Sequence, residues 1–154
     1  GQGHWPGTVT EHLFDDEMAP MASPELVARM GGIGARPLAQ WPLLGDEDGQ
    51  WNRWFAQAGG QPPARYVAML DDTEAHLRAA AAGVGVALGR MTRARLLLQA
   101  GQLVLLSPQR LRTGTGHWLV YPERSRRHQG FAAFRDWLLA QAADYTRDSA
   151  ATPA

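Results

Sequence analysis

The clearest pattern in the chain is a helical repeat followed by a short apolar run. Asp71 and Glu74 have the spacing of a capping box at a helix start. Apolar residues then recur at the i, i+3, i+4, i+7 positions of one helix face: Leu77, Ala80, Ala81 and Val84. Residues 84–88 form an apolar run without alternation, which is typical of a strand that is buried on both faces. We therefore predict a helix, a glycine turn and a buried strand over 71–89.

The same alternation of strand and helix continues on both sides of this unit. The periodicity predicts further helices over 23–30, 51–58 and 91–100 and after Gly130. Ser23 is the predicted N-cap of the first, and Gly59 is the predicted stop of the second. Short apolar runs predict strands near 13–21, 41–44, 64–70, 103–106 and 118–121, with a loop or hinge over 107–116. This order predicts an α/β fold with a mostly parallel sheet and flanking helices.

Two glycines in the first unit, Gly83 and Gly85, could suggest a dinucleotide-binding turn. Such a turn needs the order strand, glycines, helix, so that the helix N-terminus points at the pyrophosphate. Here the helix comes first and the strand last. We therefore interpret the glycines as a helix stop and a strand entry, and predict no cofactor.

Length and composition narrow the class of protein. A chain of 154 residues can form one good core or two small lobes. No apolar run approaches the roughly 20 residues of a spanning helix, so we expect no membrane association. Fifteen acidic residues balance fifteen basic ones, which leaves no overall field for nucleic acid. The absence of cysteine excludes disulfides and thiol chemistry and fits a cytoplasmic location.

Residue types that carry catalysis or bind metals lack the necessary spacing. The five histidines make no i, i+3 or i, i+4 pair, and the serines lie at predicted helix starts, loops or the tail. We predict neither a metal site nor a catalytic nucleophile. The acidic run 15–17 could be a metal or acid–base cluster or a solvated surface run. Arg124, Arg126 and Arg127 could bind phosphate or form a solvated loop.

The start of the predicted helix after Leu70 is a better candidate for binding. In open α/β sheets, ligands lie at the carboxyl ends of strands, against helix N-termini. Asp71, Asp72 and Thr73 follow a predicted strand directly and so stand at this rim, and His117 and Trp118 could supply an opposing wall. The alternatives are that Asp71 only caps the helix while Asp72 and Thr73 only supply polar groups to its first turn, and that His117 and Trp118 only begin a strand. An aromatic row at Trp51, Trp54 and Phe55 could also line a ligand site, although core packing is the better interpretation.

Several short motifs occur in a fixed order from Gly3 to about Asp144. They are Trp5-Pro6-Gly7, Glu11 with Leu13-Phe14, Ser23-Pro24-Glu25-Leu26, Trp51 with Trp54-Phe55 and Ala58-Gly59, Asp72, Ala80-Ala81 with Gly83 and Gly85-Val86-Ala87-Leu88, Gly101 with Leu103-Val104, Trp118-Leu119-Val120-Tyr121-Pro122, and Ala133-Phe134-Arg135 with Trp137-Leu138. In this order and spacing the chain resembles the effector-binding domain of LysR-type bacterial transcriptional regulators. The subgroup of the glycine-cleavage activator and the β-lactamase regulator is the most similar.

The resemblance implies a fold of the periplasmic-binding-protein type II, with two α/β lobes joined by crossing strands near 21–23 and 106–108. One lobe would be complete and the other partial. The implied organisation is a partial outer lobe with the first crossover over 1–22, a complete inner lobe over 23–106, the second crossover and a return to the outer lobe over 107–148, and a disordered tail over 149–154.

The resemblance also implies a small-molecule effector held in a cleft between the lobes, with no catalysis. The effector would be an amino acid or a small organic acid. Its contacts would be the first turn of the helix after Leu70, the start of the strand after the second crossover and, by position, two further residues: Asp72, Thr73, His117, Trp118, Trp5 and Ser23. The family often has Tyr-Tyr or Tyr-Trp at the second pair, so His117 is a departure.

As to partners, the resemblance implies self-association, with DNA bound only through an N-terminal helix-turn-helix domain that this sequence lacks. The exposed faces of the strand at Trp118 and of the last helix are expected to drive association. The alternative function is that of a fragment of a solute-binding protein serving transport, which would call for a secretion signal. A small α/β enzyme is a third possibility that no motif supports.

Overall fold

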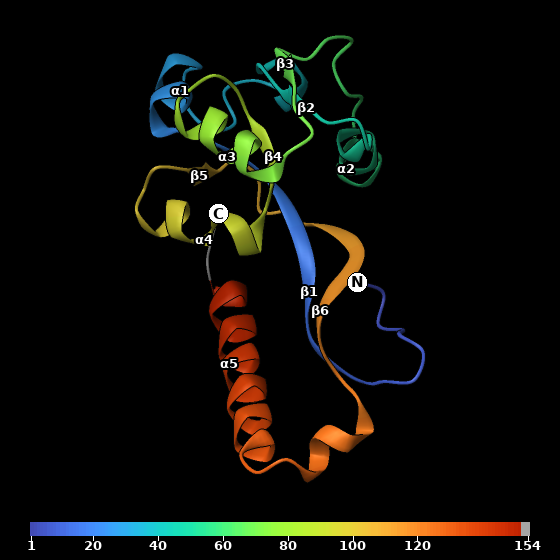
Figure 1. Ribbon diagram of the computed structural model, residues 1–154. Coiled ribbons are helices and arrows are strands. Elements are labelled where there is room, and N and C mark those ends of the chain that lie inside the picture. Colours follow the sequence, from blue (N-terminus) through green and yellow to red (C-terminus); the bar gives the residue numbers. More distant parts are fainter. Residues whose placement is uncertain (152–154) are drawn as a thin grey trace. The chain divides into compact units, whose positions relative to one another are not determined.

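The computed structural model describes residues 1–151, which form two compact units. Among the described residues, unit 1 contains residues 1–16 and 112–151, and unit 2 contains residues 17–111. Strand β1 (Val9–Ala22) is a single strand of 14 residues that runs from unit 1 into unit 2 (Figure 1). The chain changes unit at 16–17 and 111–112, whereas we expected the crossings near 21–23 and 106–108.

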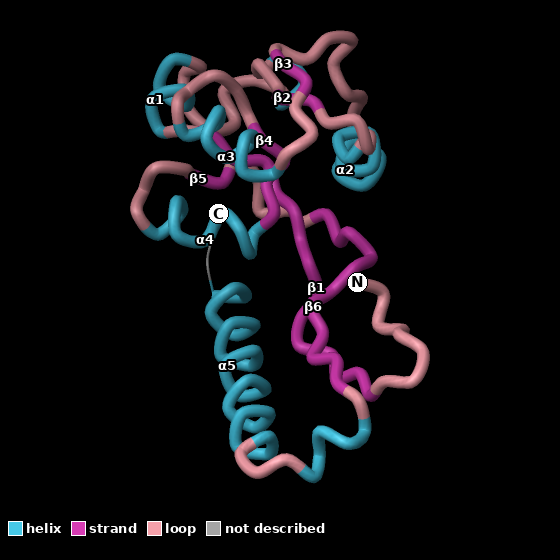
Figure 2. Tube along the Cα trace, in the orientation of Figure 1, coloured by secondary structure: helices cyan, strands magenta, loops and turns pink. Residues whose placement is uncertain are grey.

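The main sheet of unit 2 is built around β1. Strands β4 (Ala87–Arg90) and β5 (Val104–Leu105) lie on its two sides, and both run antiparallel to it. Met21 is the register partner of Ala87 on one side and of Leu105 on the other. Strands β2 (Leu44–Gly45) and β3 (Ala68–Met69) lie side by side (Figure 2). They pair in parallel.

The expected mostly parallel sheet therefore needs correction. Among the described pairings, parallel contacts are those between β2 and β3 and the bridge between Leu43 and Val86. Strands that are separated by a crossover helix run parallel, and the alternating pattern predicted this arrangement. That pattern carries no information on the direction of β1, because β1 arrives from another unit and its neighbours are strands that come much later in the chain.

Four helices of unit 2 begin and end close to the predicted places: α1 (Pro24–Arg29), α2 (Gln50–Ala58), α3 (Thr73–Ala81) and α4 (Met91–Gln99). The short 3₁₀ helix η1 (Leu38–Gln40) lies where no helix was expected. The predicted N-cap Ser23 is confirmed, since its Oγ accepts a hydrogen bond from Leu26 N at 3.1 Å. At α3 the cap is Asp72, whose Oδ1 accepts from Ala75 N at 2.8 Å, so Asp71 remains outside the cap.

The core of unit 2 confirms that the aromatic row packs inside. Trp51, Trp54 and Phe55 are buried in one apolar cluster, and Trp51 Nε1 donates a 2.7 Å hydrogen bond to Leu44 O. Val84, which we expected on the buried face of α3, is 47% exposed. The reason is Gly83, whose φ of +75° ends the helix before Val84.

Unit 1 consists of the first part of β1, strand β6 (Leu111–Tyr121), which pairs with it, the 3₁₀ helix η2 (Glu123–Arg127) and helix α5 (Phe131–Ala151). The prediction of a loop over 107–116 is wrong for residues 111–116, which belong to β6. Gly116 has a role within this strand. A Cβ there would lie 3.0 Å from Phe14 O on β1, so the close approach of the two backbones needs glycine.

Helix α5 packs on the strands through aromatic pairs. Tyr121 contacts Phe131 at a ring-centroid distance of 4.6 Å, and Phe14 contacts Tyr145 at 4.5 Å. The helix continues past the expected start of the tail at residue 149, and residues 152–154 lie outside the described residues. In the described part of the chain, no helix combines the length and the apolar character needed to span a membrane.

Candidate functional site

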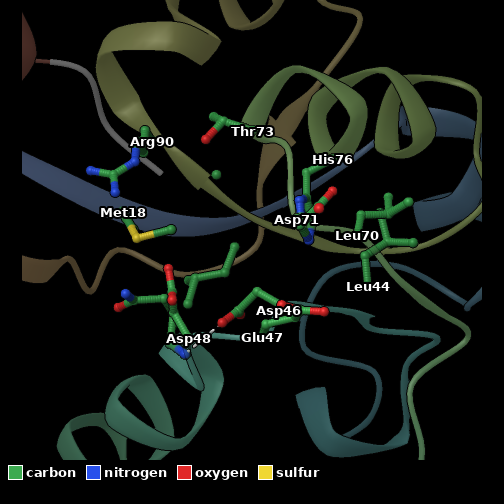
Figure 3. Close-up of a pocket in the computed structure, with 13 residues that line it drawn as sticks. Met18, Leu44, Asp46, Glu47, Asp48, Leu70, Asp71, Thr73, His76 and Arg90 are labelled. Carbon is green, nitrogen blue, oxygen red and sulfur yellow. Dashed lines mark hydrogen bonds between the residues drawn. The ribbon is translucent and has the colours of Figure 1, made fainter.

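Unit 2 contains a pocket of about 130 Å³ at the carboxyl ends of three strands (Figure 3). Asp46 follows β2, Asp71 stands two residues after β3, and Arg90 is the last residue of β4. Ligands of α/β proteins bind at this end of the sheet. The pocket also touches the first turn of α3 through Thr73.

Carboxylates dominate the polar lining. Asp46, Glu47 and Asp48 come from the loop between β2 and α2, and Asp71 comes from the connection to α3. The loop is held in place by Asp46, whose Oδ1 accepts a 2.9 Å hydrogen bond from Gln50 N. The pKa of Tyr66 is raised, first by burial of its hydroxyl and second by the negative charge of Asp46.

His76 ties the start of α3 to the end of β2. Its ring is buried, with Nε2 3.0 Å from Gly45 O and Nδ1 3.1 Å from Asp72 O. Both contacts are to carbonyl oxygens, which only accept hydrogen bonds, so the ring nitrogens act here as donors when they carry protons. One pattern in the sequence points to the burial of His76, which lies four positions before Ala80 on the same helix face.

The remaining lining is apolar apart from one cation. Figure 3 shows Met18 and Arg90 on one side of the pocket and Leu44 and Leu70 on the other. Arg90 has an interaction with other residues of the protein. The pocket thus offers carboxylates, a hydroxyl and a hydrocarbon wall to whatever enters it.

Of the site residues predicted in unit 2, one lines the pocket and two cap helices. Thr73 lines the pocket, together with Asp71, which the sequence placed at the same rim. The Asp72 carboxylate instead caps α3. Ser23 is buried and caps α1, so its hydroxyl is already used by the backbone. Their roles toward a ligand stay predictions.

Two of the residues predicted in unit 1, His117 and Trp118, lie on β6 and contact side chains of β1. His117 stacks on Phe14 at 4.5 Å. Trp118 contacts His12 edge-on at 4.8 Å and donates from Nε1 to Gly1 O at 3.2 Å. The two neighbouring side chains thus have different aromatic partners on β1, and the wall that we expected them to form stays a prediction.

Trp5 and Trp118 share the N-terminal segment as a neighbour. A Cβ at Gly1 would meet the ring of Trp5 at 2.6 Å, and one at Gly3 would meet the ring of Trp118 at the same distance. The two indoles are therefore packed against glycine backbone of residues 1–3. Trp118 also lines a cavity of about 160 Å³ in unit 1.

The acidic run 15–17 is not a uniformly solvated surface. Asp15 pairs with His12 at 2.8 Å on the surface, whereas Asp16 is only 5% exposed. Strand alternation turns these neighbours to different sides. In residues 1–151, no group of three or more His, Cys, Asp or Glu side chains has the geometry of a metal site.

Residues 1–143 match the model of a known protein family, which is described as the LysR substrate binding domain. The chain belongs to this family. Within it, the glycine cleavage system transcriptional activator of Escherichia coli K12 is 30% identical over 151 residues, covering 93% of this chain. The transcriptional activator AmpR of Pseudomonas aeruginosa PAO1 is 32% identical over 148 residues, with the same 93% coverage.

Solved structures of effector domains have a fold similar to that of this chain. The effector domain of AmpR from Pseudomonas aeruginosa matches with a TM-score of 0.74 and 31% identity, covering 97% of this chain and 72% of that one. The AmpR effector-binding domain of Citrobacter freundii has a TM-score of 0.73 at 24% identity, covering 94% of this chain and 72% of that chain. The expected fold of the periplasmic-binding-protein type II is confirmed by these likenesses.

These relatives also decide between the two expected functions. They are regulators of transcription, so a role in transport is not favoured and the effector-binding domain of a LysR-type regulator is confirmed. The chain spans about half the length of the curated relatives that it matches, since it covers 48% of the glycine cleavage activator.

Proposed function

We propose that this chain senses a small-molecule effector in the pocket of unit 2 and that it does so as part of a bacterial transcriptional regulator. Membership of the LysR substrate-binding domain family supports the sensing role. The observation that carries the choice of site is the position of Asp71 and Thr73, which line a pocket at the carboxyl ends of three strands.

The proposed action is a shift in population without chemistry. An effector that binds one conformation better than another favours that conformation by its difference in affinity. In a regulator this shift would be transmitted to an oligomer on DNA, through a DNA-binding domain that the relatives named HTH-type imply. Such a role entails a cytoplasmic protein and needs no catalytic residue or cofactor.

We retain His117, Trp118 and Trp5 as candidate effector contacts from unit 1. Asp72 and Ser23 are weaker candidates, since Asp72 Oδ1 and Ser23 Oγ each already accept a hydrogen bond at a helix start.

A ligand screen with a matched pair of threonine variants tests the proposed site. Thr73 is the first residue of α3 and lines the pocket, whereas Thr92 is the second residue of α4 and lies outside it. A thermal-shift screen with amino acids and small organic acids on the purified chain would identify ligands, and titration calorimetry would give their affinities.

We expect Thr73→Val to weaken binding by about 3-fold to 10-fold, which corresponds to one lost hydrogen bond of a hydroxyl. Thr92→Val should leave the affinity unchanged. Equal affinities for the wild type and Thr73→Val would place the ligand elsewhere and overturn the proposed site.

A further inference from the structure

We propose that the pocket of unit 2 selects a small organic cation, with an ammonium or guanidinium group, over a carboxylate of the same size. This inference rests on the proposed function, which makes the pocket the effector site. It adds the chemical class of the effector, and it departs from the amino acid or organic acid that we expected from the sequence.

The charge of the lining favours a cation. Four carboxylates line the pocket, from Asp46, Glu47, Asp48 and Asp71, against the one guanidinium of Arg90. An anion that entered would be repelled by the majority of these charges. Glu47, Asp48 and Asp71 are exposed and Asp46 is half-buried, so this repulsion acts through a partly aqueous environment and is screened by salt. A cation would lower the mutual repulsion of the carboxylates.

The hydrogen bonds already made leave the negative groups available. In the described part of the chain, no hydrogen bond or ion pair of the carboxylates of Glu47, Asp48 or Asp71 is found, while Asp46 uses Oδ1 to hold Gln50 N. Arg90 is in contrast already involved in an interaction with the protein. Among the charged side chains of the lining, acceptors for a ligand therefore outnumber donors.

His76 adds no free hydrogen-bond donor for an anionic ligand. A ligand carboxylate would need donors, and both ring nitrogens face backbone carbonyl oxygens, those of Asp72 and Gly45. The Thr73 hydroxyl can accept a hydrogen bond as well as donate one, so it suits an ammonium group equally well.

Size and hydrophobicity restrict the cation further. A volume of about 130 Å³ corresponds to roughly ten water positions, enough for a ligand with about as many non-hydrogen atoms. Leu44, Leu70, Leu88 and Met18 form the hydrocarbon part of the lining. A short alkyl chain with one or two ammonium groups fits this combination, with its methylenes against the leucines and its charges near the acidic loop and Asp71 (Figure 3).

A matched pair of probes tests the charge preference directly. We would titrate 1,5-diaminopentane and glutarate, which share a five-carbon chain and differ in the sign of their charges, into the purified 154-residue chain at low ionic strength, using 1,5-pentanediol as a neutral reference. We expect 1,5-diaminopentane to bind at least 10-fold more tightly than glutarate, and 0.5 M salt to weaken it.

Variants locate the bound cation. Asp71→Asn and Glu47→Gln each remove one charge from the lining and should weaken diamine binding by about 5-fold or more. Glu25→Gln removes an exposed carboxylate on α1, outside the pocket, and should have no effect. Far-UV circular dichroism and the melting temperature would show that each variant is folded.

Three results would overturn the inference. Tighter binding of glutarate that depends on Thr73 would reverse the charge class while leaving the proposed function intact. Diamine binding that Asp71→Asn and Glu47→Gln leave unchanged would show general attraction of cations to the surface. If neither probe binds at millimolar concentration, the cation preference fails, and the threonine screen described above then decides separately whether the pocket is the effector site.

Discussion

Arg135 on α5 forms a two-pronged ion pair with Glu11 on β1, 124 residues earlier in the chain. Arg135 Nε donates to Glu11 Oε1 at 2.7 Å, and a second hydrogen bond joins Nη2 to Oε2. The Tyr121 hydroxyl on β6 donates to the same carboxylate at 2.5 Å. One side chain thus connects both strands of unit 1 to its helix, and its protonation should affect the stability of this unit.

The pKa of Glu11 is lowered, first by the hydrogen bond from Arg135 and second by that from Tyr121. A carboxyl group with a lowered pKa in the folded state stabilises the protein at pH values above its unfolded pKa. That stability is lost as the pH falls through the lowered value. We therefore expect Glu11→Gln to be less stable than the wild type at pH 7 and the difference to shrink below about pH 4.

Thermal melts of wild type and Glu11→Gln between pH 3 and pH 7 would measure this. Glu123→Gln is the control. Glu123 forms an exposed ion pair with Arg126 in the same unit, and because exposed pairs contribute little, this variant should change the stability little at any pH. A stability difference for Glu11→Gln that stays constant over this range would contradict the role assigned to the carboxylate.

The packing of unit 2 predicts that alanine substitution of two leucines on neighbouring helices has very different effects on stability. Leu77 on α3 is fully buried, whereas Leu96 on α4 is 76% exposed. Leu77→Ala should lower the free energy of unfolding by about 2–5 kcal/mol, because it leaves a cavity. Leu96→Ala should change it by less than about 0.5 kcal/mol. Urea denaturation measures both values, and comparable losses would contradict the packing.

The two aspartates before α3 should separate stability from binding. Asp72→Ala removes the helix cap and should cost about 0.5–2 kcal/mol in urea denaturation. Asp71→Ala should cost little stability but weaken a ligand of the pocket. If Asp72→Ala weakened the ligand and left the unfolding free energy unchanged, the assignment of cap and lining would be reversed.

The exposed aromatic side chains of α5 predict self-association. Phe134 and Trp137 are 49% and 57% exposed, and their rings lie 6.0 Å apart. Adjacent exposed aromatics are typical of surfaces that bind another chain. We expect sedimentation velocity to show a concentration-dependent oligomer that Phe134→Ser with Trp137→Ser weakens. Leu96→Ser, at an exposed leucine of α4, is the control, and a wild-type monomer at all concentrations would refute this expectation.

Features that depend on neighbouring residues were predictable from the sequence. The cap at Ser23 and the helix stop at Gly59 are local, because a side chain or a glycine satisfies the backbone a few residues away. The direction of β1 was not predictable, since its partners are β4 and β5, more than 60 residues later.

In the candidate site too, local features were predictable and long-range ones were not. Thr73 was predicted from a general rule about strand ends, but the contribution of Asp46 was missed. The acidic loop reaches the start of α3 because β2 and β3 pair with Leu44 beside Ala68 and Gly45 beside Met69, which brings the two strand ends together. A shift in that register would separate these carboxylates from Asp71, and composition alone does not specify the register.

The central position of β1 in its sheet has a consequence for protein synthesis. Residues 18–22 of this strand leave the ribosome early, yet their hydrogen-bonding partners are residues 87–90 and 104–105. Until those residues are made, both edges of an apolar strand that contains Met21 and Ala22 remain unpaired. A nascent chain that pauses before residue 87 would therefore expose a segment suited to intermolecular pairing, and chaperone binding to nascent chains should concentrate in this interval.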